Sequence, residues 1–188
     1  MSIKDKLLKI KSALPEHVTL VAVSKTKPIS DLTKAYNAGQ RVFGENKIQE
    51  MTEKWEQMPK DIQWHMIGHV QTNKVKFMAP YVSLIHGVDS LKLLEEINKQ
   101  ALKNNRIIDC LLQIHIAEEE TKFGLNEDEL EDLLVSESFK NLNNIKIVGL
   151  MGMATFTNNK NQIQKSYFSV VLTGRIPLEE RIFLYLSE

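Results

Sequence analysis

The sequence predicts an α/β fold of the (β/α)₈ TIM-barrel type. Two observations carry this prediction: apolar segments with strand character alternate with helical segments along most of the 188 residues, and polar residues follow directly after the strand ends. Such alternation indicates a parallel sheet with right-handed crossovers, and in a barrel the strand ends form the rim that bears the site. An open doubly wound sheet is the alternative, but no Gly-x-Gly-x-x-Gly motif follows the first strand, so its dinucleotide-binding version lacks its fingerprint.

The first predicted strand is residues 18–24, an apolar and β-branched run. It shows no polar alternation, which is typical of a strand buried on both faces of a parallel sheet. Before it, apolar residues at helical spacing predict a helix that begins at a capping box, Ser2 with Asp5, and ends before Pro15.

The remaining predicted strands and helices continue this alternation. We expect strands at 41–46, 63–68, 82–88, 109–116 and 145–151, and helices at 31–38, 47–58, 71–78, 90–104 and from 126 onward. Ser30 is the expected N-cap of the helix 31–38, and Gly39 stands where a C′ glycine ends a helix. Asn126 with Glu129 opens the last helix. Six strands and 188 residues fall short of the eight strands and ~250 residues of a complete barrel.

The charge balance gives no indication of a nucleic-acid or membrane partner. Lysine plus arginine equals aspartate plus glutamate at 24 each, so the formal net charge is zero. No apolar run approaches the ~18 residues of a spanning helix, and the N-terminus has no signal-peptide h-region. Cys110 is the only cysteine, which excludes an intramolecular disulfide and fits a reducing, cytoplasmic location. Its apolar neighbours predict a buried hydrophobe rather than a nucleophile.

Lys25 is the strongest candidate for a reactive residue, because it directly follows the first predicted strand. At a barrel rim we expect partial desolvation, and a second cation, Lys27, stands two residues on. Both effects favour the neutral amine, the form that condenses with an aldehyde to give a Schiff base. The spacing by itself does not distinguish Lys25 from a solvated surface lysine.

Other polar residues also follow the predicted strand ends: Glu45, Asn46, His69, Asp89, Lys122 and Thr155. His65 and His69 are four apart, but in a strand that spacing separates them by ~13 Å, too far to share a metal ion. Packing or hydrogen bonding is the simpler expectation for each histidine. The acidic run 118–120 is expected to be a solvated loop, and Met66, Met151 and Met153 are expected to be packing residues.

Four segments resemble the pyridoxal phosphate homeostasis protein family, which is similar in fold to the N-terminal barrel of alanine racemase. They are Val21–Lys27, Gly39–Asn46, Trp64–Lys74 and Gly149–Phe156, and the resemblance covers roughly Val18 to Gln164. It implies an alanine racemase-like (β/α)₈ barrel that binds pyridoxal 5′-phosphate (PLP) as a cofactor.

The resemblance also implies roles for single residues. Lys25 would carry PLP as a Schiff base, and Asn46 would lie near the cofactor. Lys27 and Lys122 match family lysines that could serve as secondary docking or transfer points. The implied function is intracellular vitamin B6 and amino acid homeostasis without catalysis, with PLP and PLP-dependent apo-enzymes as partners and with no nucleic acid or membrane.

The sequence departs from the family after about Ser169. The Gly-rich and Arg-Ile-Gly-like segments of the family's seventh and eighth strands are absent, so we expect a partial barrel at 1–168, lacking the last two strands, and an atypical tail at 169–188. A frameshift or an early stop would produce such a tail, and we expect PLP binding weaker than in a full-length relative. The alternatives are a PLP-dependent enzyme of the racemase or decarboxylase kind, a Schiff-base aldolase, and a truncated non-functional homologue.

Overall fold

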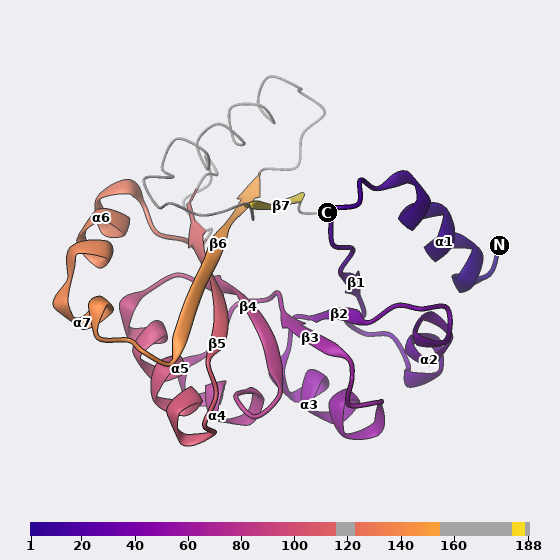
Figure 1. The fold of residues 1–188 in the computed structure, drawn as a ribbon, viewed down its shortest axis with the longest axis horizontal. Coiled ribbons are helices and arrows are strands. Elements are labelled where there is room, and N and C mark those ends of the chain that lie inside the picture. The colour runs from indigo at the N-terminus through magenta and orange to yellow at the C-terminus, as the bar shows by residue number, and fades with distance from the viewer. Residues whose placement is uncertain (116–122, 155–181, 187–188) are drawn as a thin grey trace.

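The fold is one parallel sheet that curves into an open arc. The computed structural model describes residues 1–115, 123–154 and 182–186. Seven strands are hydrogen-bonded in chain order from β1 to β7, and each neighbouring pair is parallel. Figure 1 shows helices along the outer side of the arc and β1 and β7 at its two ends. This arrangement confirms the predicted α/β fold with a parallel, barrel-type sheet, which is open among the described residues.

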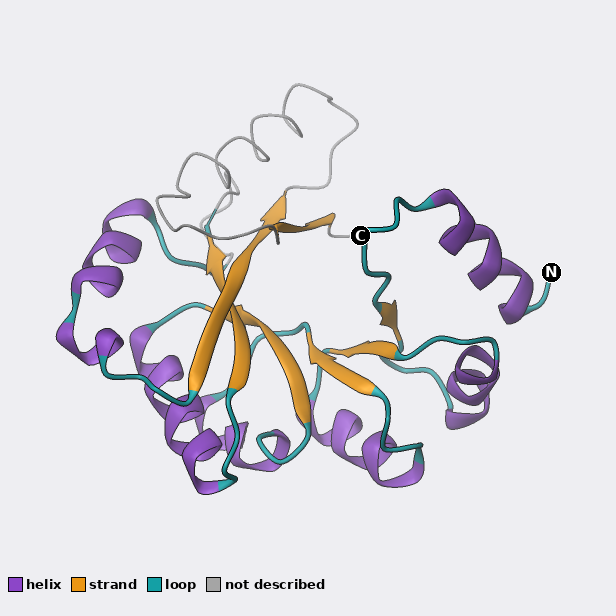
Figure 2. Cartoon of the chain, in the orientation of Figure 1, coloured by secondary structure: helices purple, strands orange, loops and turns teal. Residues whose placement is uncertain are grey.

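The strands and helices alternate along the chain (Figure 2). The strands are β1 (Ala22–Val23), β2 (Val42–Glu45), β3 (Gln63–Met66), β4 (Val82–Val88), β5 (Ile108–Ile114), β6 (Ile145–Ala154) and β7 (Ile182–Leu186). The helices are α1 (Ile3–Ala13), α2 (Ile29–Asn37), α3 (Ile48–Gln57), α4 (Val75–Met78), α5 (Leu91–Lys103), α6 (Glu127–Val135) and α7 (Glu137–Lys140), with a 3-10 helix, η1 (Thr72–Lys74), before α4. The helix predicted at 71–78 is therefore divided between η1 and α4.

The seventh strand corrects the expected number of strands. β7 pairs in parallel with β6 from Leu150↔Ile182 to Ala154↔Leu186. The sequence of this segment does not continue the regular alternation of strand, loop and helix. The boundary predicted at 168/169 lies in residues 155–181, outside the described ranges, and stays a prediction.

The first strand is shorter and more exposed than predicted. β1 comprises only Ala22 and Val23, and Val18 and Val23 are 42% and 49% exposed, so the expectation of burial on both faces is wrong. The reason is the position of β1 at the end of the sheet. It pairs only with β2, so one flank has no neighbouring strand among the described residues.

The helix ends follow local backbone chemistry. The capping boxes predicted at the starts of α1 and α6 are both present. The prediction of Ser30 as N-cap is wrong, because α2 begins at Ile29 and Pro28 occupies the capping position. Proline fits there because its ring fixes φ and the position needs no backbone N–H. Gly39 has φ of +91°, which confirms the predicted C′ glycine after α2.

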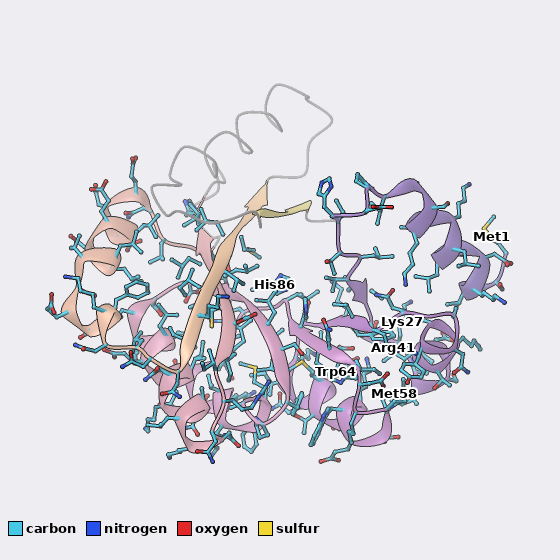
Figure 3. All side chains as sticks on the ribbon, viewed as in Figure 1. Met1, Lys27, Arg41, Met58, Trp64 and His86 are labelled. Carbon is cyan, nitrogen blue, oxygen red and sulfur yellow. The ribbon has the colours of Figure 1, made fainter. Side chains whose placement is uncertain are left out.

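The hydrophobic core lies mainly between the sheet and the outer helices. Trp64, Cys110 and Ile97 belong to this large cluster and are fully buried, which confirms the prediction for Cys110; burial raises the pKa of its thiol. A second, small cluster of Leu84, Leu111 and Met151 lies on the inner side of the sheet. Figure 3 shows Trp64 on the helix side of the arc and His86 on its inner side. The side chains of neighbouring strand residues therefore serve two different layers.

Candidate functional site

Lys25 lies in a tight turn directly after β1. The Lys27 N–H donates to the Ser24 carbonyl oxygen over 3.0 Å, which closes a four-residue turn with Lys25 in its second position. The third position, Thr26, has φ of +62°. A β-branched residue in the left-handed region costs about 1–3 kcal/mol and persists only where surrounding contacts hold it. The backbone around Lys25 is therefore fixed at a measurable cost in stability.

The Lys25 side chain is exposed, and it follows a buried serine. The Ser24 hydroxyl donates to Glu45 Oε1 over 2.6 Å on the helix side of the sheet. Lys25 has no hydrogen bond or ion pair among the described residues. The burial expected for a lysine at the rim is therefore not found at this position.

A buried lysine, Lys54 of α3, lies behind the Lys25 turn. Lys54 Nζ donates to Ser24 O over 2.7 Å, to Glu45 Oε1 over 2.7 Å and to Glu50 Oε1 over 2.6 Å. The same Glu50 oxygen accepts the Thr26 N–H over 2.6 Å. The network therefore contacts the backbone of both residues that flank Lys25, one through a cation and the other through a carboxylate.

The two carboxyls of this network have different electrostatics. Burial raises the pKa of Glu45 above its usual range, and the hydrogen bonds from Lys54 and Ser24 only partly offset it. Burial also raises the pKa of Glu50, but the hydrogen bonds from Lys54 and the Thr26 N–H outweigh it, so the net shift is downward. Glu45 Oε2 is buried and has no hydrogen-bond partner among the described residues. Glu50 therefore ionises more readily than Glu45, and its carboxylate accepts the Thr26 N–H.

Asn46 lies at the same level of the rim as Lys25. The β1–β2 register ends with the pair Val23 and Gly44, and Lys25 and Asn46 each stand two residues beyond that pair. Asn46 is exposed, and its backbone is contacted by the chain after β3: a Cβ added at Gly68 would lie 2.5 Å from the Asn46 carbonyl oxygen. Only glycine permits this approach, so Gly68 helps to fix the position of Asn46.

His69 and Asp89 meet at the ends of β3 and β4. His69 Nδ1 lies 3.4 Å from Asp89 Oδ2, and the imidazole stacks on Phe123 with ring centroids 4.0 Å apart. A shallow pocket of about 500 Å³ adjoins this pair. It is lined by His69, Val70, Gln71, Thr72, Asn73, Asp89, Ser90 and Leu93. Of the rim residues named from sequence, the structure brings these two into direct contact.

Two histidines pair inside the arc. His86 Nε2 lies 3.0 Å from His65 Nδ1, and both rings are buried. Burial and, to a smaller extent, the charge of the neighbouring His65 together lower the pKa of His86 to about 3. His65 and His69 therefore have different partners, in agreement with the prediction that they do not act together.

The comparisons with known proteins assign this arrangement to a family. The profile of the alanine racemase N-terminal domain matches residues 1–179. The chain belongs to the alanine racemase N-terminal domain family. Among curated relatives, it is 39% identical to the pyridoxal phosphate homeostasis protein of Aquifex aeolicus over 150 residues, 79% of this chain and 64% of the relative. The corresponding Escherichia coli K12 protein is 36% identical over 143 residues, 74% of this chain and 60% of that protein.

Solved structures of this family have the same fold. PipY of Synechococcus elongatus PCC7942 superimposes with a TM-score of 0.85 at 31% identity, over 92% of this chain and 80% of PipY. A second PipY structure contains PLP and has a TM-score of 0.82. Alanine racemase of Clostridium difficile 630, at 14% identity and a TM-score of 0.77, covers 99% of this chain and 53% of the racemase, and shares the fold alone. The chain spans less than two thirds of the length of the curated relatives cited above.

Sequence reasoning placed Glu45 at the rim of this family's fold, and the structure corrects that. Glu45 shares the helix-facing side of β2 with Phe43 and bonds to α3, so it does not face the inner side. Strand alternation from Phe43 and the spacing of four between Glu50 and Lys54 on one helix are signals that could have revealed the network. Lys122, Thr155 and the acidic run 118–120 lie outside the described residues. Within the described ranges, no helix is long and apolar enough to cross a membrane.

Proposed function

We propose that this chain is a PLP-binding protein of vitamin B6 and amino acid homeostasis that carries PLP as a Schiff base on Lys25 and catalyses no reaction. One observation carries the proposal: Lys25 is exposed, has no partner among the described residues, and stands in a hydrogen-bonded turn directly after β1. The names of the relatives and the PLP in the second PipY structure support the choice of cofactor.

The residues at this rim suit an aldehyde ligand. The neutral Nζ of Lys25 adds to an aldehyde carbon, and loss of the carbonyl oxygen as water leaves a C=N bond. Asn46, at the same level of the neighbouring strand, supplies amide donors and an acceptor for polar groups of the ligand. We assign PLP binding to residues 1–168 and expect Lys27, exposed two residues on, to be a secondary docking point.

The proposed physiological role is exchange of PLP with PLP-dependent apo-enzymes. Absence of catalysis is part of the proposal and has its own test. The protein loaded with PLP is incubated with single L-amino acids, and we expect no racemisation, decarboxylation or transamination above the level of free PLP. Turnover that requires Lys25 would instead support a PLP-dependent enzyme.

Borohydride trapping tests the covalent site. The protein is incubated with PLP and reduced, and the modified lysine is identified by peptide mass spectrometry. We expect the adduct on Lys25, loss of that adduct in Lys25→Ala, and retention in Lys27→Ala, which removes the other exposed lysine of the turn. An adduct spread over exposed lysines, or one unchanged in Lys25→Ala, would contradict the proposal.

A further inference from the structure

We propose that Lys54 and Glu50 form a positioning pair that fixes the direction in which Lys25 projects from the rim. Among the described residues, neither has a hydrogen bond or ion pair with the Lys25 side chain; both act through the backbone of the turn. The inference rests on the proposed function, because positioning has a consequence only if Lys25 reacts with an aldehyde.

The contacts bracket Lys25 on both sides. On its N-terminal side, the Ser24 carbonyl oxygen accepts Lys54 Nζ over 2.7 Å as well as the Lys27 N–H that closes the turn. On its C-terminal side, the Thr26 N–H donates to Glu50 Oε1 over 2.6 Å. Lys54 and Glu50 are joined to each other over 2.6 Å on one face of α3. The peptide units before and after Lys25 are thus tied to a single rigid helix.

The strained backbone of Thr26 marks what the pair maintains. A positive φ of +62° is unfavourable for a β-branched residue, and it persists only when neighbouring contacts impose it. The Glu50 carboxylate is the contact made to that residue's N–H. Without it, Thr26 relaxes toward negative φ and the direction of the neighbouring Lys25 side chain changes.

The chemistry of the network favours positioning over stabilisation alone. Lys54 is 5% exposed and Glu45 is fully buried, so both charges are removed from water. Buried ion pairs contribute little net stability compared with apolar side chains of similar volume. The additional feature of this cluster is directional: its hydrogen bonds end on the two residues that flank the reactive amine.

The test uses the full chain with pyridoxal, which lacks the phosphate, and with PLP in parallel. Variants are Glu50→Ala, Glu50→Gln and Lys54→Gln, and the control is Lys99→Ala, which removes an exposed lysine–glutamate pair on α5. Three quantities are measured: the rate at which a borohydride-trapped adduct forms at Lys25, the induced circular dichroism of the bound aldehyde, and the urea midpoint of unfolding.

We expect Glu50→Ala to slow adduct formation at Lys25 by about tenfold, the effect of losing one charge-assisted hydrogen bond, and to abolish the induced circular dichroism. Glu50→Gln retains an oxygen that accepts from Thr26 and Lys54, so it should recover most of both signals. Lys54→Gln should resemble Glu50→Ala, and Lys99→Ala should resemble the wild type. If the pair has only a structural role, the variants change the urea midpoint of unfolding, and Glu50→Gln does not restore the adduct rate or the circular dichroism.

Equal rates and equal circular dichroism in the wild type and Glu50→Ala would overturn the positioning role and leave the proposed function intact. Absence of any adduct at Lys25 in the wild type would overturn the proposed function and this inference with it. If the variants do not fold, amide hydrogen exchange in the wild type decides: the Thr26 amide should be protected despite its exposed turn, and an unprotected amide would overturn the inference.

Discussion

Gly68 shows how one residue sets the geometry of the rim. The Asn46 backbone occupies the space that a side chain at position 68 would need, with the nearest atom 2.5 Å from an added Cβ. Backbone atoms cannot move aside as a flexible side chain can. We therefore expect Gly68→Ala to lower the free energy of unfolding by about 1–3 kcal/mol, the usual cost of overpacking, as measured by urea denaturation.

Gly39→Ala is the matched comparison for Gly68→Ala. Gly39 has positive φ but no atom within 4 Å of an added Cβ. Alanine at this position therefore introduces backbone strain but no steric clash. We expect a loss of about 1 kcal/mol and no effect on the rim. If Gly68→Ala costs no more than Gly39→Ala, the close approach between residues 46 and 68 does not constrain the fold.

The burial of His86 makes the stability of the fold depend on pH. The pKa of His86 is about 3 in the folded protein and 6.5 as its ordinary value. Between these two values the unfolded chain binds a proton at this residue that the folded chain does not. Stability from His86 is therefore fully present above pH 6.5 and is lost as pH falls toward 3.

We expect the free energy of unfolding to fall between pH 6.5 and 5 more steeply in the wild type than in His86→Gln, by up to about 1.4 kcal/mol per pH unit. Glutamine stays neutral and retains hydrogen-bonding groups, so the slope, rather than the absolute stability, is the informative quantity. His17→Gln, at an exposed position, should leave the slope unchanged. Parallel slopes for the wild type and His86→Gln would show that His86 does not stay neutral in the fold.

Two helices on the outer side of the sheet differ in how they begin. In α6 the Asn126 side-chain oxygen accepts the Glu129 N–H over 2.9 Å, and the Glu129 carboxylate accepts the Asn126 N–H over 2.9 Å. In α5 the Ser90 side chain makes no capping hydrogen bond. We expect Asn126→Ala to lower the free energy of unfolding by about 1 kcal/mol, and Ser90→Ala to change it little. Urea denaturation measures both, and equal losses would contradict the assignment of the caps.

The elements best predicted from sequence are those that local signals define. The strand β4 matches its predicted bounds, Val82–Val88, and six of its seven residues are buried. The start of α6 matches because a capping box is a local motif. The bounds of β1 and the presence of β7 could not be predicted, because they depend on which strands become neighbours. The apolar run 18–24 has the composition of a central strand but occupies an end of the sheet.

The candidate site, like the fold, could be predicted from the sequence only in part. Lys25 could be placed at a rim from the strand before it, and the family motifs directed attention to its chemistry. Its exposure could not be inferred, because it results from the open arc. The network behind it joins β1, β2 and α3 through Ser24, Glu45 and Lys54. These residues are up to thirty positions apart, so only the packing of the helix on the sheet brings them together.

The whole molecule has two apolar layers of unequal size. The outer layer, between sheet and helices, contains most of the buried side chains, whereas the inner side has the small cluster of Leu84, Leu111 and Met151. Among the described residues, the inner side has far less apolar burial than the outer side, so we expect the outer layer to supply most of the stabilisation. This consequence can be tested with two neighbouring residues of one strand.

Leu111 and Leu112 of β5 are both fully buried but belong to different layers: Leu111 to the inner cluster and Leu112 to the outer core. Leucine-to-alanine changes in cores cost about 2–5 kcal/mol, and the cost rises with the cavity that remains. Helices pack on the outer side and prevent collapse, so we expect Leu112→Ala near the upper end of that range. Leu111 belongs to a small cluster of three buried residues, so we expect Leu111→Ala near the lower end. Urea denaturation of both variants gives the two values. If Leu111→Ala costs as much as Leu112→Ala, the inner side is packed as tightly as a closed barrel, and the open arc is not the arrangement that stabilises the molecule in solution.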